Sequence, residues 1–417
     1  MSLSDDEQRR RLTLLDRVFR SGAPVDREDL FSGRREQLAS VMEAINSIGQ
    51  HVVIFGERGV GKTSVAATCA DITSRSGSFA MRINCDQSDN FASLWQKVID
   101  EFQIVLQKAA DESRSQLREA TERATEVLNF DQIGPNQVRI ALRNITVLAP
   151  VVIIFDEFDQ LADQGALSLF SNTIKLLADQ IEDITLIAVG VSDSVAELIS
   201  GHISIQRNLV QVRMPRMTRS ELSGILEHGL SALKMTSTDE ARKFVERIPR
   251  GFPQYAHMLG QEGARQALFN GSDTVELSHV VIGMNVGLTK VDHSLASAFD
   301  QATYSARPSN YKDLLYACVL IDPDDDGFFT PAALRVPFSA IVGQKRDIGH
   351  YNPNLVTLSQ DRGCILSRKG PERSRRYRFS DPLMEPYVLL RGISSGRIDL
   401  SQMIPPDDDS NEPETLF

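Results

Sequence analysis

Runs of apolar residues recur along the first half of the chain and alternate with longer amphipathic stretches. Each run is rich in Val, Ile and Leu, and such runs are typical of strands that are buried on both faces. Strands that alternate with helices form parallel sheets in α/β layer architectures. The sequence therefore predicts a parallel sheet whose strands are residues 51–55, 79–84, 151–155, 184–190 and 209–214.

The pattern changes twice further along the chain. The length of 417 residues exceeds the roughly 250–300 at which a single core stops growing, so we expect two or three domains. Helical periodicity follows the last predicted strand, and short helical segments then precede two further strands. We predict an N-terminal helix in 1–25, an α/β core in 26–215, a helical lid in 216–303, a third domain in 304–396 and a disordered acidic tail in 397–417.

Composition excludes several classes of protein. Hydrophobic residues make up 41% of the chain and charged residues 24%, as in ordinary globular proteins. The apolar runs are far shorter than the roughly 20 residues that span a bilayer, so we expect no membrane segment. The first residues lack the apolar stretch of a secretory signal. The cysteines form no CxxC pair, and we expect reduced thiols in a cytoplasmic protein.

A glycine-rich loop follows the first predicted strand. Residues 56–63 match G-x-x-x-x-G-K-T without a break, and a helical pattern continues after them. Glycines let the backbone curl so that its N–H groups point at phosphate oxygens, and the helix N-terminus adds positive charge. This pattern predicts a nucleotide-phosphate site formed by Gly56, Glu57, Arg58, Gly59, Val60, Gly61, Lys62, Thr63 and Ser64.

Two acidic residues end the third predicted strand. Charges at the end of a buried strand are costly unless they are solvated or paired. In an enzyme with this type of phosphate loop, one acid supports Mg²⁺ and the next polarises the attacking water. We assign these roles to Asp156 and Glu157, with Asp159 as the next candidate base, and expect Lys62 to contact the β/γ-phosphates of ATP and Thr63 to ligate Mg²⁺.

The two motifs resemble those of the AAA+ ATPases, and the segment 31–36 (FSGRRE) is similar to their origin-recognition and archaeal-initiator branch. The resemblance covers roughly residues 26–392. It implies a polar sensor after the fourth strand, where Asp193 stands in place of the usual Asn, and Ser192 is the alternative. It also implies that Arg207, just before the fifth strand, completes a neighbouring subunit's site. A surface position is the competing interpretation of each residue.

The lid departs from the initiator pattern. Residues 250–254 read RGFPQ, whereas initiators carry Gly-x-Ala-Arg at this place. The Gly-x-Pro form resembles the STAND group of signalling ATPases, whose proline packs against adenine. This resemblance implies that Pro253 contacts nucleotide, unless it only opens a helix. Gln254 takes the position of the missing sensor arginine, and we therefore expect slow turnover.

Residues 310–392 fit a winged-helix pattern, with three helices, the third from about Pro353 to Asp361, followed by a hairpin. Although the net charge of the chain is -11, the hairpin is strongly basic. Such a cluster could bind DNA phosphates, but a protein contact or a solvated surface also explains it. Its cations are Arg368, Lys369, Arg373, Arg375, Arg376 and Arg378.

The turn at residues 322–327 imitates the start of a calcium loop. It reads DPDDDG, but Ala333 stands at the twelfth position, where a calcium loop needs a bidentate Glu. We therefore expect a solvated turn and no calcium.

Two functions remain open. The first is an ATP-binding, Mg²⁺-dependent and slowly hydrolysing switch of the STAND type, which forms homo-oligomers or recruits a partner protein. The second is an initiator-like ATPase that binds DNA through the winged helix.

Overall fold

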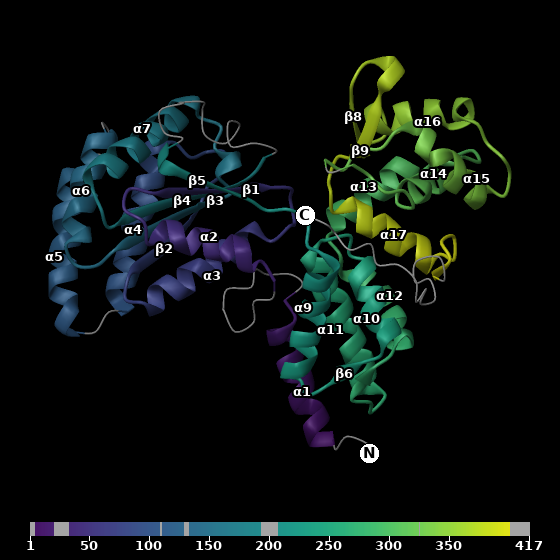
Figure 1. Cartoon of the computed structure of the whole chain (residues 1–417), viewed down its shortest axis with the longest axis horizontal. Coiled ribbons are helices and arrows are strands. Elements are labelled where there is room, and N and C mark those ends of the chain that lie inside the picture. Colours follow the sequence, from purple (N-terminus) through teal and green to yellow (C-terminus); the bar gives the residue numbers. More distant parts are fainter. Residues whose placement is uncertain are drawn as a thin grey trace, which may run out of the picture. The chain divides into compact units, whose positions relative to one another are not determined.

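The computed structural model describes residues 5–20, 33–108, 111–128, 133–192, 207–324 and 326–400. The chain divides into two compact units (Figure 1). One consists of Ala23–Arg216 and is called the core unit. The other combines Met1–Gly22 with Met217–Phe417 and is called the second unit. The N-terminal helix therefore belongs with the lid rather than forming a unit of its own.

The core unit contains the five-stranded sheet that the apolar runs predict. All strand pairs are parallel, and the order is β2-β3-β4-β1-β5. The register aligns Val52 of β1 with Ile187 of β4 and with Val210 of β5. The strands are β1 (His51–Gly56), β2 (Phe79–Asn84), β3 (Val151–Asp156), β4 (Ile184–Val191) and β5 (Leu209–Arg213).

Helices cover both faces of this sheet, which explains why the inner strands β1, β3 and β4 lack polar alternation. On one face, α2 and α3 lie against the strands (Figure 1). On the other, buried side chains of α4, α6 and α7 form one hydrophobic cluster with β1–β4, centred on Trp95, Phe155 and Phe170. The helices are α2 (Arg35–Ile45), α3 (Lys62–Arg75), α4 (Phe91–Lys108), α5 (Asp111–Val127), α6 (Pro135–Thr146) and α7 (Gln164–Gln180).

The lid consists of helices, as predicted, together with one short parallel strand pair. Its N-terminal partner α1 (Asp5–Val18) packs against α9 and α11. Phe19, which follows α1, fills a slot between two glycines: a Cβ at Gly229 or Gly260 would come within 2.2 or 2.5 Å of its ring. The lid elements are α9 (Arg219–Ala232), β6 (Thr236–Ser237), α10 (Asp239–Arg247), α11 (Pro253–Phe269), β7 (Thr274–Val275) and α12 (Leu277–Lys290).

The C-terminal part of the second unit contains helices and one antiparallel hairpin. Its third predicted helix is longer than expected: α16 begins at Ile348, and Pro353 lies inside it rather than at its start. The proline costs only one bond near the helix N-terminus, to the carbonyl of Gly349. The elements are α13 (His293–Thr303), α14 (Tyr311–Cys318), α15 (Arg335–Val342), α16 (Ile348–Gln360), β8 (Leu366–Lys369), β9 (Arg376–Phe379) and α17 (Met384–Ser394).

Two further expectations concern the chain as a whole. All four cysteines are free: Cys69, Cys85 and Cys318 are buried and Cys364 is exposed. Among the described residues, no helix is both long and apolar enough to cross a membrane. Most of the acidic tail, from residue 401 onward, lies outside the described residues.

Candidate functional site

The glycine-rich loop connects the carboxyl end of β1 to the start of α3. Gly56, Gly59 and Gly61 all have positive φ angles, of 147°, 84° and 96°. Gly56 is also tightly enclosed, because a Cβ there would lie 2.5 Å from the carbonyl oxygen of Met214. Only glycine accommodates this path without strain. The loop therefore brings the positive N-terminus of α3 to the edge of the sheet, where an anion is favoured.

The ammonium group of Lys62 lies inside this loop. Its Nζ atom donates to the carbonyl oxygens of Gly56 at 3.0 Å and Glu57 at 2.7 Å, and the residue is 8% exposed. Burial lowers its pKa to about 8, although the charges of Asp159, Asp156 and Glu57 act in the opposite direction. A buried cation in the first turn of a helix suits a strongly anionic ligand.

Asp156 and Thr63 meet at the carboxyl ends of β3 and β1. The hydroxyl of Thr63 donates to Oδ1 of Asp156 at 3.2 Å, and the N–H of Glu157 donates to the same oxygen at 3.0 Å. Burial raises the pKa of Asp156, while these two hydrogen bonds oppose the rise. The structure therefore brings together the two residues that the sequence predicted as metal ligands.

Glu157 differs from Asp156 in exposure and in backbone conformation. Its side chain is exposed, and its φ angle of 56° places it in the left-handed region. A non-glycine residue there costs roughly 1–3 kcal/mol and is common at functional sites. The side chains of these two consecutive residues therefore lie in different surroundings. Asp156 is buried, whereas Glu157 is exposed to solvent.

Asp159 links this turn to the end of β4. Its Oδ1 accepts a hydrogen bond from the N–H of Val191 at 2.8 Å, so the segment preceding the predicted sensor is tied to the acidic turn. Ser192 is buried at 9% exposure. Asp193, the other sensor candidate, lies outside the described residues.

Two arginines outside the G-x-x-x-x-G-K-T motif brace the phosphate loop. Arg34 is 2% exposed and donates to the carbonyl oxygens of Val60, at 3.1 Å, and Pro215. Arg216 pairs with Glu57, and its Nε atom lies 2.7 Å from Oε2. Arg34 lies within the segment 31–36, whereas Arg216 has no local signal, because its partner Glu57 is 159 residues away.

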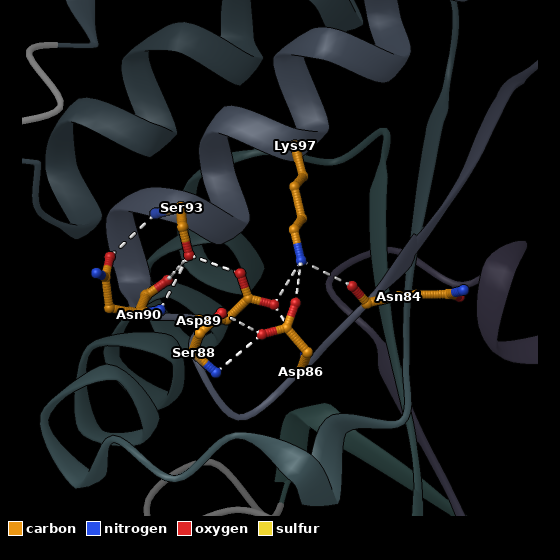
Figure 2. A network of polar contacts seen from close by, with 7 residues as sticks. All are labelled: Asn84, Asp86, Ser88, Asp89, Asn90, Ser93 and Lys97. Atoms are coloured by element: carbon orange, nitrogen blue, oxygen red, sulfur yellow. Dashed lines mark hydrogen bonds and ion pairs between the residues drawn. The ribbon is translucent and has the colours of Figure 1, made fainter.

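A polar network holds the loop between β2 and α4 (Figure 2). Lys97 contacts Asp89 at 2.6 Å, Asp86 at 3.1 Å and the carbonyl oxygen of Asn84 at 3.1 Å. Asp89 is 4% exposed, so Lys97 neutralises a buried carboxylate. Because Asn84 is in register with Asp156, the network stabilises the sheet edge next to the candidate site.

The oxygen atoms of this site fit Mg²⁺. A carboxylate and a hydroxyl lie in contact, and Mg²⁺ prefers oxygen ligands that it completes with water and substrate phosphates. Over the described ranges, no group of three or more His, Cys, Asp or Glu side chains could hold a metal ion. The Thr63–Asp156 pair suits an ion whose remaining ligands are water and substrate phosphates.

The remaining predicted residues belong to other elements. Arg207 is on the surface at the amino end of β5, 3.6 Å from Asp179, with its side chain 72% exposed. Pro253 is the first residue of α11 in the second unit, followed by Gln254. Their positions relative to a nucleotide remain predictions.

The basic hairpin is only partly open. Arg376 pairs with Asp324 at 2.6 Å. It also lies over the ring of Phe328, as do Lys369 and Arg378. Within the turn, Oδ1 of Asp324 accepts from the N–H of Phe328 at 2.7 Å. The turn that imitates a calcium loop is thus bound to the hairpin rather than merely solvated, because Asp324 has a cationic partner 52 residues away.

Comparisons with known proteins agree with this arrangement. Residues 30–187 match the family model described as an AAA ATPase domain, and no curated protein matches the chain. The ORC2 protein of Aeropyrum pernix, solved in ADPNP–ADP complexes, has a TM-score of 0.51 and 13% identity, covering 91% of this chain and 98% of that one. A Walker-type ATPase of Pyrococcus abyssi has a TM-score of 0.51 and 16% identity, covering 89% and 99%. These similarities show the fold, that of the P-loop nucleoside triphosphatases.

Proposed function

We propose that the protein binds ATP with Mg²⁺ and hydrolyses it slowly as a molecular switch, because residues 30–187 match an AAA ATPase domain. The observation that carries the proposal is the meeting of Thr63 and Asp156, 3.2 Å apart, beside the buried Lys62. These residues come from two separate motifs and converge at one edge of the sheet.

Each residue has a distinct role in this proposal. The loop N–H groups and Lys62 bind the β/γ-phosphates, and Thr63 and Asp156 hold Mg²⁺. Bound Mg²⁺ supplies positive charge that offsets the charge developing on the phosphates. Glu157 is exposed and orients the attacking water, accepting its proton.

The proposed switch uses residues of both units. The phosphate loop lies in the core unit, whereas Pro253 and the lid lie in the second unit. We propose that Pro253 contacts the nucleotide and that Asp193 or Ser192 senses the γ-phosphate. Arg207, which is exposed, would complete the site of a neighbouring copy in a homo-oligomer.

Two substitutions test the nucleotide site. Lys62→Ala should abolish or severely weaken ATP binding in calorimetry, because it removes the buried cation. Glu157→Gln should still bind ATP but should not hydrolyse it, because the glutamate orients the attacking water and does not bind the nucleotide. Equal ATP affinity in Lys62→Ala and wild type would refute the site. Wild-type turnover in Glu157→Gln would move the role of base to Asp159.

A second candidate function is DNA binding through residues 304–396, which we interpret as a winged helix. The supporting observation is that Arg373 is exposed and Arg375 partly exposed in the connection between β8 and β9. Cations in such a connection can reach phosphates on a duplex. Fluorescence anisotropy with a labelled duplex at low and moderate salt distinguishes this function from recruitment of a partner protein.

A further inference from the structure

We infer that Arg216 couples nucleotide binding at the phosphate loop to the connection between the two units. This inference rests on the proposed ATP binding and adds a residue that neither nucleotide motif contains. Arg216 acts as a positioning residue: it pairs with Glu57 of the loop and is also the last residue of the core unit.

The Glu57–Arg216 pair is well formed and partly covered. Nε lies 2.7 Å from Oε2 and Nη2 lies 3.4 Å from Oε1, so the guanidinium contacts both carboxylate oxygens. The side chains are 26% and 22% exposed. A two-point pair of this kind is stronger and more directional than an ordinary surface ion pair.

The pair balances charge where the phosphates bind. Glu57 lies within the phosphate loop, and its charge acts on the ammonium group of Lys62. An uncompensated carboxylate there would repel a triphosphate. Arg216 offsets this charge, and its removal therefore weakens ATP more than ADP, which carries less charge.

The segment that carries Arg216 is also bonded to the loop and to β1, the strand that leads into it. The N–H of Met214 donates to the carbonyl oxygen of Phe55 at 2.7 Å, and Arg34 bridges the carbonyl oxygens of Pro215 and Val60. A movement of the loop on nucleotide binding is thus transmitted to residues 214–216.

The connection leads directly to the candidate nucleotide motif of the lid. Met217, the first lid residue of the second unit, donates its N–H to the carbonyl oxygen of Gly251 at 2.9 Å. Gly251 has a φ angle of 87° and lies two residues before Pro253. Arg216 is therefore one peptide bond from a segment that is hydrogen-bonded to the lid turn.

The experiment measures ATP and ADP affinity by calorimetry and hydrogen exchange of residues 214–222 with and without ATP. Arg216→Ala should weaken ATP binding about tenfold, within the usual range of coupling between sites. It should also abolish the ATP-dependent change in exchange of this segment. Adding Glu57→Gln to Arg216→Ala should recover most of the lost affinity, because the unpaired carboxylate is then gone.

Arg213→Ala is the matched control. Arg213 is exposed in β5, three residues before Arg216, and its loss removes the same charge. This variant should match wild type in affinity and in exchange. Arg216→Gln, which keeps the aliphatic stem and a hydrogen-bond donor but removes the charge, replaces Arg216→Ala if the latter does not fold.

The outcomes separate the inference from the function on which it rests. Wild-type ATP binding together with equal affinity and exchange in the Arg216 and Arg213 variants would overturn the coupling and leave the ATPase intact. An absence of ATP-dependent exchange at residues 214–222 in a wild type that binds ATP would also overturn it. Failure of the wild type to bind ATP would overturn both.

Discussion

Burial changes the pKa of Lys62, the lysine of the phosphate loop. Its ammonium group is enclosed by the carbonyl oxygens of Gly56 and Glu57, and burial brings its pKa down to about 8. Phosphate oxygens favour the protonated lysine. The loop therefore contains a cation that is charged at neutral pH and begins to lose its proton slightly above it.

This pKa predicts how ATP affinity depends on pH. Below about 8 the lysine is already protonated, whereas above 8 ATP must bind together with a proton. Affinity should therefore fall as pH rises, by up to about tenfold per unit. Calorimetry in two buffers of different ionisation enthalpy should show proton uptake on binding at pH 9.

Lys62→Arg provides the control, because a guanidinium remains protonated over this range. Its residual ATP affinity should not change between pH 7.5 and 9.5. The same decline in both proteins would assign the pH dependence to another group.

The docking of α1 on the lid shows packing at the scale of an element. Phe19 is 1% exposed and lies between Gly229 of α9 and Gly260 of α11, with its ring edge against His257 at a centroid distance of 6.2 Å. Ion pairs add to this contact, since Asp16 lies 2.6 Å from Arg265 of α11. The small residues of the lid form the slot, and the aromatic ring fills it.

Filling this slot should release α1. In Gly260→Ala the new Cβ would stand 2.5 Å from the ring of Phe19, so the ring has to leave. Overpacking of this kind costs about 1–3 kcal/mol. We expect a lower melting temperature and faster proteolysis within residues 5–20.

Gly349→Ala is the matched control for this substitution. Gly349 also lies in a helix of the second unit, and a Cβ there meets nothing within 4 Å. Alanine should leave stability unchanged or raise it by up to about 1 kcal/mol. Equal melting temperatures for the Gly260 and Gly349 variants would contradict the role of the slot.

At the scale of the whole molecule, the phosphate loop and the basic hairpin belong to different units. The cations of the hairpin differ in their contacts. Arg376 is paired with Asp324, whereas Arg373 and Arg375 have no ion pair with another described residue. Any duplex contact is therefore expected from the exposed Arg368, Lys369 and Arg373 and the partly exposed Arg375 rather than from Arg376.

Replacing Arg373 and Arg375 with Glu should leave ATP affinity unchanged and weaken DNA binding. Loss of two phosphate contacts should flatten the slope of log affinity against log salt by about 1.8. Anisotropy titrations at several salt concentrations measure this slope. If the double variant binds DNA as the wild type does, Arg373 and Arg375 do not contact phosphates. If neither protein binds DNA, the hairpin as a whole does not.

Arg376→Ala separates a structural effect from a phosphate contact. It breaks the pair with Asp324, which should lower stability slightly, by about 0–1 kcal/mol as for exposed pairs. Its salt slope should remain close to that of the wild type.

The sequence by itself determined the features that depend on local pattern. The run at residues 151–155 became β3, Val151–Asp156, and all five predicted strands end within one residue of their expected limits. The glycine loop and the acidic turn could also be found, because each is a short motif whose chemistry requires particular residues at fixed spacing. Their meeting at one edge follows from the parallel sheet.

Only the tertiary structure decided which distant residues meet. Arg216 and Glu57 are 159 residues apart, and Asp16 and Arg265 are 249 apart. The same holds for Asp324 and Arg376, which are 52 residues apart. Their ion pair joins the turn at residues 322–327, which we expected to be solvated, to the hairpin. Such pairs have no periodicity or motif, because a contact between remote side chains depends on how whole elements pack. Local sequence pattern specifies an element's type, whereas its partners depend on the shape of the folded chain.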